Sequence, residues 1–578
     1  METDKCSPES VSLQRVKPRP RDKMADRSGG YSRKDPESLR DLIVELAQNT
    51  GMHGVPNIQR SSSWRWRTLW LCVVGFGVSM MLWKVIEAFQ KYYRYPVDTK
   101  INFYYSPSLD FPAVSICNMN PFRLSQLSQL SDQGNEGSMK VYLQKGVEEK
   151  SHLSNRSTIK NWYDDERDAD YHDQQSDDYS FYEQYLAYYV VLGEKKINMG
   201  HSLRDMMLSC SYNGRRCSPR NFTRFGNSHY GNCYMFNHDG KLTSRDVGPL
   251  HGLILELYIE QSEYISALAE SAGIRVTVHN QSVMPFPEDN GFSARPGTKT
   301  SAGITRADVS RAYPPYGPCQ QYDREDNQQR NAFLSVLDFV NYTSAACKKT
   351  CYQKSLLEKC ECYNPNFPYD PNITAFRSLQ LEDKDIKPCT NLEKKDEMQP
   401  CVHSIDEDYQ QNQLPCSSEC PVECIATEYT VILSSSMYPS SATETTVLER
   451  LLYHSKELNT LLENSDNNTR QLFVSENVVK LEVYFEDLNY KDIRTEPSYK
   501  SLDLMSDIGG QAGLWLGMSV ISLFEVVELV MALLGLICTK VLTRTARTDD
   551  ANSERKRENS KSRRDEKYTA FSLNLSRT

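Results

Sequence analysis

The stretch at residues 508–542 constrains this chain most, because few folds can accommodate so long an apolar segment. Its 35 residues include two acidic side chains and one lysine. At about 1.5 Å per residue, a helix of this length spans roughly 50 Å, well beyond a bilayer core of about 30 Å. We therefore expect a membrane span that tilts, breaks or protrudes.

Two features of this stretch favour a cation pathway. Gly509, Gly513 and Gly517 recur every four residues, so on a helix they form a smooth stripe that we expect to face neighbouring subunits or a pore. Glu525 and Glu528 share one helix face, and intramembrane carboxylates are costly unless they meet water, cations or partners. The alternative is an ordinary glycine-rich anchor helix with its glutamates near the cytoplasmic end.

A second apolar segment, residues 69–89, has aromatic and basic flanks at residues 64–67 and 91–95. Flanks of this kind sit at membrane interfaces. The first 60 residues are polar and contain no hydrophobic region of the signal-peptide sort, so we expect a retained span. Two spans place both termini on the same side of the membrane.

Charge, cysteines and glycosylation sequons together indicate which side that is. From residue 540 onward there are eleven Lys or Arg against six Asp or Glu, which favours cytoplasmic tails. Fourteen of the 17 cysteines lie between Cys117 and Cys424, which predicts disulfides in an oxidising compartment. Six sequons in the same loop predict glycosylation at Asn155, Asn221, Asn280, Asn341, Asn372 and Asn467.

Residues 164–183 combine nine acidic side chains with several aromatic rings and a single arginine, Arg167. The simpler interpretation is a solvated helical protrusion, since charge runs are usually exposed. The sharper hypothesis is a site for a cationic, aromatic ligand, because carboxylates pair with guanidinium groups and rings offer cation-π contacts. The candidate binding residues are Asp177, Asp178, Phe181 and Tyr182.

The remainder of the loop predicts both strands and helices. Alternation at residues 480–485 predicts a half-buried strand. The cysteine pattern at residues 347–362 fits either a metal knuckle or disulfides, and the sequons around it favour disulfides. A helix there, bridged to a neighbour, would be stiff, and the amphipathic stretch 442–463 is the candidate partner helix. Further strands are expected at residues 111–118, 252–258 and 273–280, with an aromatic turn at 314–319.

Several motifs, taken in chain order, resemble the degenerin and epithelial sodium channel superfamily. They are His53-Gly54, FPAVSICN (111–118), the cysteine-rich block, YFEDLNY (484–490) and DIGGQAGLWLGMSVISLFE (507–525). The resemblance covers roughly residues 50–540. It implies an α+β membrane protein and a trimer of subunits, each with two transmembrane helices flanking a large, disulfide-rich, hand-like ectodomain with finger, thumb, palm, knuckle and β-ball parts. The implied divisions are a cytoplasmic tail (1–63), the first transmembrane helix (64–92), the ectodomain (93–506), the second transmembrane helix (507–542) and a cytoplasmic tail (543–578).

The resemblance also assigns roles to individual residues. Gly517, Met518 and Ser519 occupy the Gly-x-Ser selectivity motif, where the second transmembrane helix is interrupted. Ser506 falls at a small-residue position where bulky substitutions hold related channels open, and Asp507 at the outer pore mouth. The other implied positions are His53 and Gly54 for the gating motif, Tyr95 and Tyr316 for the aromatic coupling pair, and Gly513, Glu525 and Glu528 for the gate and pore.

The same resemblance implies a complete pairing of the fourteen loop cysteines. The implied bridges are Cys117–Cys233, Cys210–Cys217, Cys319–Cys424, Cys347–Cys420, Cys351–Cys416, Cys360–Cys401 and Cys362–Cys389.

The function that we expect is a ligand-gated, amiloride-sensitive, sodium-selective channel opened by an extracellular FMRFamide-type neuropeptide. Residues 273–287 look most like the invertebrate peptide-gated branch of the superfamily. One alternative is a proton-gated channel with carboxylates of raised pKa as the sensor. Another is a passive, disulfide-rich cell-surface receptor. No nucleophile elbow, zinc-protease or phosphate-loop motif favours an enzyme.

The expected surroundings follow from this interpretation. We expect a homotrimer in the plasma membrane, with membrane lipid around the two spans and amiloride as a blocker. No cofactor, resident metal or nucleic acid is expected. The permeant ion is Na⁺, and a divalent cation could block at the pore mouth.

Overall fold

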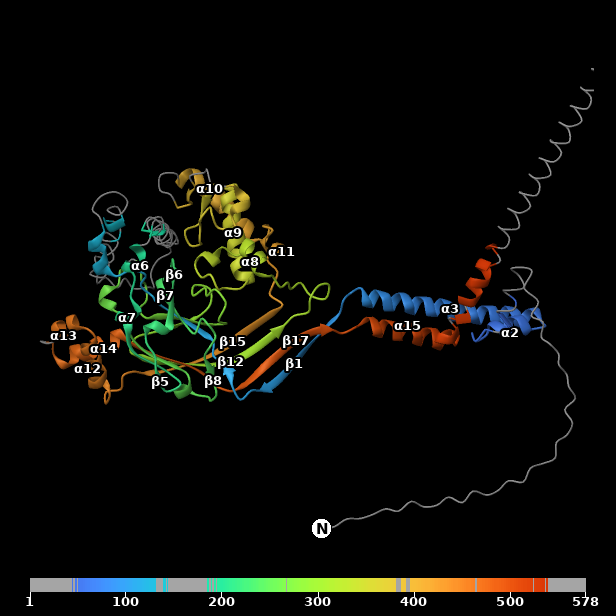
Figure 1. The fold of residues 1–578 in the computed structure, drawn as a ribbon, viewed down its shortest axis with the longest axis horizontal. Coiled ribbons are helices and arrows are strands. Elements are labelled where there is room, and N and C mark those ends of the chain that lie inside the picture. Colours follow the sequence, from blue (N-terminus) through green and yellow to red (C-terminus); the bar gives the residue numbers. More distant parts are fainter. Residues whose placement is uncertain are drawn as a thin grey trace, which may run out of the picture. The chain divides into compact units, whose positions relative to one another are not determined.

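The computed structural model describes residues 50–130, 195–266, 268–380, 386–390, 395–462, 465–522 and most of 524–538, with a few further helical positions (Figure 1). The described chain divides into two compact units. One consists of residues 1–90 and 501–578, and the other of residues 91–500.

The first unit is helical and largely apolar. α3 (Trp64–Tyr92) is, among the described residues, the one helix that is by itself long and apolar enough to cross a membrane. α15 (Ser501–Leu516) and the following helix (Val520–Gly535) pass the same test only as a pair, and they meet at an angle of 83°. The long apolar segment predicted from the sequence is therefore broken. A short helix, α2 (Val55–Arg60), precedes α3.

The second unit contains two main β-sheets. In its described part the larger sheet has eight strands in the order β1-β17-β12-β16-β9-β4-β5, with β15 on the other side of β12. The strands are β1 (Val97–Tyr105), β4 (Met207–Tyr212), β5 (Arg215–Arg216), β9 (Leu253–Tyr258), β12 (Thr298–Ser310), β15 (Ile425–Met437), β16 (Val478–Phe485) and β17 (Asn489–Pro497).

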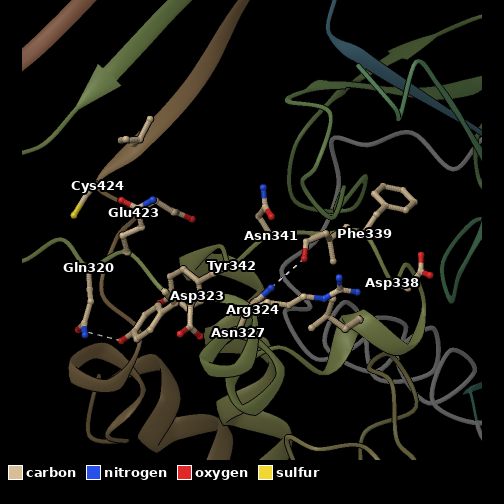
Figure 2. A pocket seen from close by; sticks show the side chains of 15 residues that line it. Gln320, Asp323, Arg324, Asn327, Asp338, Phe339, Asn341, Tyr342, Glu423 and Cys424 are labelled. Carbon is tan, nitrogen blue, oxygen red and sulfur yellow. Dashed lines mark hydrogen bonds between the residues drawn. The ribbon is translucent and has the colours of Figure 1, made fainter. Parts of the chain in front are cut away.

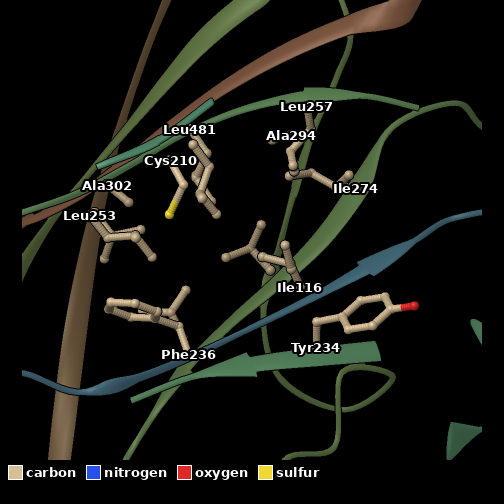
Figure 3. Packing of buried hydrophobic residues seen from close by; sticks show 14 of the residues in the cluster. Ile116, Cys210, Tyr234, Phe236, Leu253, Leu257, Ile274, Ala294, Ala302 and Leu481 are labelled. Carbon is tan, nitrogen blue, oxygen red and sulfur yellow. The ribbon is translucent and has the colours of Figure 1, made fainter. Parts of the chain in front are cut away.

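The smaller sheet has the order β11-β10-β3-β7-β6. Its strands are β3 (Ala113–Asn118), β6 (Phe222–Asn227), β7 (Gly231–Phe236), β10 (Ile274–His279) and β11 (Phe292–Ala294). Buried side chains from both sheets, including Ile116, Phe236, Leu253 and Leu481, form a common core (Figure 3). Two short pairs complete the strands, β2 (Leu109–Asp110) with β8 (Thr243–Ser244) and β13 (Cys362–Tyr363) with β14 (Lys387–Pro388).

The strand predicted at residues 480–485 is more deeply buried than its alternation indicated. Leu481 and Val483 join the core, as expected. Glu482 on the other face is also buried, since Ser301 Oγ donates a hydrogen bond to its Oε2 atom over 2.9 Å and Lys299 Nζ lies 3.6 Å away. β16 lies between β12 and β9, so both of its hydrogen-bonding edges are paired. The prediction of a half-buried strand is therefore confirmed, with Lys480 and Tyr484 partly exposed and Glu482 as the one buried exception.

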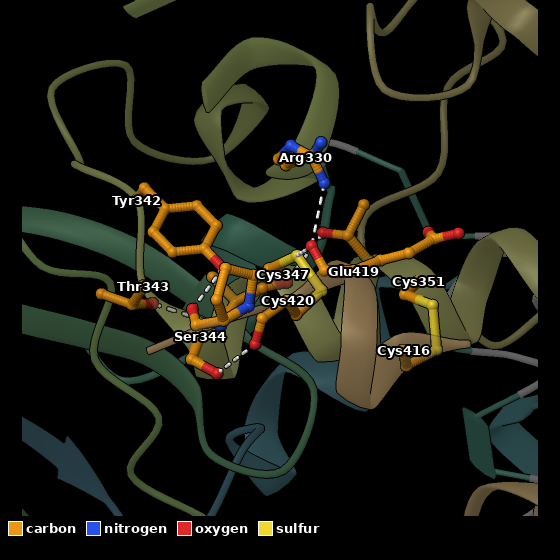
Figure 4. The surroundings of a disulfide bond; sticks show 12 residues. Arg330, Tyr342, Thr343, Ser344, Cys347, Cys351, Cys416, Glu419 and Cys420 are labelled. Atoms are coloured by element: carbon orange, nitrogen blue, oxygen red, sulfur yellow. Dashed lines mark hydrogen bonds between the residues drawn. A yellow bond between two sulfur atoms is a disulfide. The ribbon is translucent and has the colours of Figure 1, made fainter. Parts of the chain in front are cut away.

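The described helices of this unit flank the sheets. They are α6 (Lys195–Met199), α7 (Leu203–Met206), α8 (Arg324–Arg330), α9 (Ser344–Lys359), α10 (Lys395–Gln410), α11 (Cys416–Glu419), α12 (Glu444–His454), α13 (Lys456–Leu462) and α14 (Asn467–Asn477). Cys347 and Cys351 lie one turn apart on α9 and bond to Cys420 and Cys416, which holds α11 against α9 (Figure 4).

The helical partner predicted for the cysteine-bearing helix was wrong. Residues 442–463 do not form that partner, because they divide into α12 and α13 and pack instead with α14 and one end of β9 and β16. Val447 and Leu451 are buried there beside Tyr258. An amphipathic face requires an apolar partner, but its spacing does not say which one. The disulfides to α10 and α11 occupy the flank of α9 instead.

Candidate functional site

The break in the second apolar segment is built on glycine. α15 ends at Leu516, and Gly517 adopts φ +65°, a left-handed conformation that glycine adopts without strain. The Gly517 N–H donates to the Gly513 carbonyl over 2.9 Å, and the Met518 N–H donates to the Ala512 carbonyl over 3.1 Å. These two bonds satisfy carbonyls that the end of a helix otherwise leaves unpaired.

The next helix starts with a reciprocal cap. The Ser519 N–H donates to Ser522 Oγ over 3.2 Å, and the Ser522 N–H donates to Ser519 Oγ over 3.4 Å. This is the arrangement of a capping box, with serine at both positions. Residues 517–519 are thus a short non-helical belt with a defined end on each side. Ser522 was not among the predicted residues, although its spacing from Ser519 carried the signal.

The belt is supported by the segment before the first span. The His53 N–H donates to the Leu516 carbonyl over 2.8 Å. The His53 imidazole fills the space that a side chain at Gly517 would need, since its Cγ atom lies 2.6 Å from the ideal Cβ position. The fold therefore places the histidine motif against the belt, although more than 460 residues separate them in the sequence.

Gly54 explains how the chain reaches this position. Its φ is +87°, and it precedes the first turn of α2. A Cβ atom there would lie 2.8 Å from Val74 Cγ2 and 3.5 Å from Trp70 Cε3. Both the backbone conformation and the close approach to α3 therefore require glycine.

The two predicted intramembrane carboxylates differ in their surroundings. Glu525 is partly buried, and the Gly51 N–H donates to its Oε2 atom over 3.1 Å. Glu528 is exposed. Glu525 therefore connects the helix after the belt (Val520–Gly535) to the segment that precedes the first span. Gly51 was missed, since nothing in its local sequence marks it.

α3 and α15 approach closely at a second glycine that the sequence analysis did not single out. A Cβ atom on Gly77 would lie 3.0 Å from the Trp515 carbonyl oxygen, and the Phe76 and Trp515 rings meet edge to face at 6.1 Å. The predicted gate residues, Ser506 and Asp507, lie on exposed positions of α15. The predicted glycine stripe is shorter than expected, because Gly517 lies beyond the end of α15 and faces His53. Its other two members are open in the single chain, since Gly509 has nothing within 4 Å of an added Cβ and Gly513 has only the Met518 carbonyl.

The predicted coupling pair is in contact within the second unit. Tyr95 and Tyr316 lie 5.3 Å apart, ring centroid to ring centroid, with an interplanar angle of 81°. Such edge-to-face pairs are favourable. Tyr95 has φ +49°, which turns the chain sharply just before β1. Tyr499, which follows β17 at the same end of the paired strands, lies near Tyr92, and the Lys91 ammonium lies 4.3 Å from the centre of its ring.

All fourteen loop cysteines are bonded, in the same seven pairs that the resemblance implied. Cys72 and Cys538 are free and exposed. The acidic candidates Asp177, Asp178, Phe181 and Tyr182 lie outside the described residues, as does the sequon at Asn155. The sequon asparagines at positions 221, 341, 372 and 467 are exposed, and Asn280 is partly buried.

Comparison of the chain with known proteins identifies its family. A family model described as amiloride-sensitive sodium channel matches residues 46–529. The chain is 26% identical to epithelial sodium channel subunit gamma of Rattus norvegicus, over 85% of this chain and 81% of the relative. It is 27% identical to subunit alpha of Xenopus laevis, over 86% and 82%, and 28% identical to subunit alpha of Homo sapiens, over 88% and 80%.

The family match extends from the segment before the first span, through the disulfide-bonded unit, to the helix after the belt. It therefore contains both His53 and Gly517. Members of the matched family are ion channels, not enzymes. The chain belongs to the amiloride-sensitive sodium channel family.

Proposed function

We propose that this chain forms a sodium-selective pore whose filter is the belt at residues 517–519 and which opens when an FMRFamide-type peptide binds the ectodomain. The observation that carries the pore assignment is the break after Leu516, supported by the His53 ring. Non-helical backbone is tolerated at membrane depth where protein buries it or where it lines a water-filled path. Carbonyl groups released from the helical ladder can replace part of the hydration shell of a cation.

The proposed assembly is a homotrimer in the plasma membrane with both termini cytoplasmic. Phe76 and Trp83 of α3 are 62% and 60% exposed, which suits contact with lipid. Leu514 of α15 is 74% exposed and lies beside the open glycine stripe. A neighbouring α15 helix could pack closely against that face, because glycine lets backbones approach.

The proposed gating route runs through the paired strands that join the two ends of the ectodomain chain to the helices. β1 and β17 pair along their full length, from Val97 with Pro497 to Tyr105 with Asn489. The Tyr95–Tyr316 contact sits at the end of this ladder. A displacement of the loop that carries Tyr316 would therefore act on the residues that lead into α3.

The composition of residues 164–183 motivates peptide gating, and four carboxyl groups of the described ectodomain do not act as proton sensors. The structure shifts the pKa of four of these groups clearly, and each shift is downward, through hydrogen bonds from neighbouring side chains. They are Asp239, Asp466, Asp487 and Glu496. A carboxyl of lowered pKa stays ionised in mild acid, so these groups do not provide an acid sensor. The acidic, aromatic segment at residues 164–183 instead suits a peptide with a guanidinium and an aromatic ring.

The test is two-electrode voltage clamp of cells that express this chain alone. FMRFamide is applied at neutral pH and then acid without peptide, with amiloride as the blocker. We expect a sodium-carried, amiloride-sensitive current with the peptide. A current with acid alone would contradict peptide gating, and no current under either condition, with the chain at the cell surface, would favour a passive receptor or a missing subunit.

A matched pair of variants tests the location of the peptide site. Asp177→Asn with Asp178→Asn should raise the peptide concentration needed for half-maximal current. Asp164→Asn with Asp165→Asn removes the same charge from the same segment and should have the smaller effect. Unchanged potency in the first double variant would reject this placement.

A further inference from the structure

A cavity of about 460 Å³ in the second unit has a basic lining. One wall is the β4–β5 hairpin and the other is the segment around β8, and neither belongs to the proposed pore or to the β1–β17 ladder. The cations that line it are Arg215, Arg216, Lys241 and Arg245, and no acidic residue of the described chain lines it. Its volume falls in the range of ligand sites, about 300–1,000 Å³.

This basic cavity does not follow from the overall composition, because the chain has a formal net charge of −9. The cavity beside α8 has the opposite charge, since three acidic residues and a single cation, Arg324, line it (Figure 2). The basic cavity lies in a basic part of the sequence. Residues 204–246 contain seven Arg or Lys and three Asp, which is a local excess of four positive charges.

Most cations of the basic cavity have no anionic partner. The Lys241 ammonium forms an ion pair with the Asp239 carboxylate over 2.8 Å. The guanidinium groups of Arg215, Arg216 and Arg245 form no ion pair with any residue that the structure describes. All three arginines are exposed, so an incoming anion can reach them. Guanidinium groups bind oxyanions through two parallel N–H bonds, and these donors are available for that purpose.

The hairpin wall has a fixed backbone. Asn213 and Gly214 have φ of +49° and +69°, the pattern of a tight two-residue hairpin turn. A disulfide between Cys210 and Cys217 closes the hairpin, and the Cys217 N–H donates to the Cys210 carbonyl over 3.1 Å. Binding to a pre-formed backbone loses less conformational entropy than binding to a loop that must first become ordered.

The opposite wall is anchored to the core of the unit. β8 pairs with β2, and the Leu242 N–H donates to Asn237 Oδ1 over 3.1 Å. The Tyr212 and Phe236 rings also line the cavity, with their centroids 5.6 Å apart, and Phe236 is buried in the core. Both walls therefore present their cations from fixed backbones.

We propose that the basic cavity binds a sulfated polysaccharide at the cell surface. Sulfate groups supply the negative charge and the acceptor oxygens that guanidinium groups bind. Two walls with two cations each suit a polymer with repeated charges better than a single small anion, and the exposed positions let the polymer continue beyond the cavity. The proposal rests on the cell-surface placement of the second unit and is independent of peptide gating.

The test is surface plasmon resonance of the purified full-length chain over immobilised heparin at physiological ionic strength. Desulfated heparin, which keeps its carboxylates, is the matched probe. We expect saturable binding to heparin that weakens as salt is added, and little binding to the desulfated polymer. Arg215→Gln with Arg216→Gln, and Lys241→Gln with Arg245→Gln, should each weaken heparin binding by roughly two- to thirtyfold.

The matched control is Arg324→Gln with Arg377→Gln, which removes two exposed arginines from other parts of the second unit. This variant should keep the heparin affinity of the wild type. No heparin binding by the wild type would overturn the proposal. Equal binding to desulfated heparin, or an equal loss in the control variant, would reveal a general attraction to polyanions and would overturn it as well.

The rim of the basic cavity also carries a predicted glycosylation site. Asn221 lines the cavity, and its Oδ1 atom accepts a hydrogen bond from the Ser218 N–H over 2.9 Å. Asn221→Gln removes the glycan acceptor and should bind heparin at least as tightly as the wild type. Heparin binding seen only in this variant would identify the glycan as the native occupant, and the proposal would then fail.

Discussion

Substitution of Gly517 by alanine tests the central contact of the site directly. The added Cβ atom would lie 2.6 Å from His53 Cγ and closer still to other ring atoms, whereas carbon atoms pack at about 3.5–4.0 Å. Either the ring or the belt must therefore move. The left-handed backbone, at φ +65°, adds about 1–2 kcal/mol for any residue with a Cβ atom. That strain alone corresponds to a shift of about five- to thirtyfold in a conformational equilibrium.

We expect Gly517→Ala to reach the cell surface but to lose most of its sodium current or its selectivity over potassium. His53→Ala removes the ring and keeps the backbone N–H that donates to the Leu516 carbonyl. The double variant should therefore recover part of the current that Gly517→Ala alone loses. The measurement is whole-cell current and reversal potential, with surface labelling of each variant, analysed as a double-mutant cycle.

Two results would refute this reasoning. A Gly517→Ala channel with normal current and reversal potential would show that the ring does not occupy the space beside the belt. A double variant no better than Gly517→Ala would leave backbone strain as the sole cause, and the contact with His53 would then carry no functional energy.

Three further predictions concern the gate, the filter and the ectodomain. Ser506→Phe on the exposed face of α15 should give a standing inward current, and a silent variant at the cell surface would count against the gate assignment. Ser519→Asp should change the sodium-to-potassium permeability ratio, so an unchanged reversal potential would place the filter elsewhere. Burial lowers the pKa of His279 to about 4, below its unfolded value of 6.5, so stability should fall as pH drops between these values, by about 1–3 kcal/mol in all. His279→Gln should flatten that slope in thermal unfolding between pH 7 and 5, and a slope unchanged from wild type would disprove the contribution.

Local sequence patterns accounted for much of the architecture. The strands at residues 252–258 and 273–280 were placed almost to the residue, since alternating apolar side chains and flanking turns are properties of neighbouring positions. The first span runs from Trp64 to Tyr92, where the aromatic and basic flanks indicated it. Family resemblance, rather than spacing, supplied the disulfide pairs, because fourteen cysteines permit very many connectivities.

Errors arose where burial depended on a distant partner. The alternation at residues 480–485 correctly predicted a half-buried strand, but it did not show that Glu482 is buried through its hydrogen bond from Ser301. Residues 442–463 had the amphipathic spacing of a packing helix, yet the surface that received them was the end of the sheet around Tyr258. A periodic pattern reports which face is apolar, and the tertiary structure decides what covers it.

The sequence by itself therefore determined the two apolar segments and the cysteine-rich loop between them, because each depends on composition along one stretch, while the position of the belt came from the family resemblance. Only the tertiary structure showed that the His53 ring fills the place of the missing side chain at Gly517, and that the Gly51 N–H donates to the Glu525 carboxylate. Both features join segments distant in sequence. Such contacts are fixed by packing, hydrogen bonding and steric exclusion in three dimensions, which no local pattern encodes.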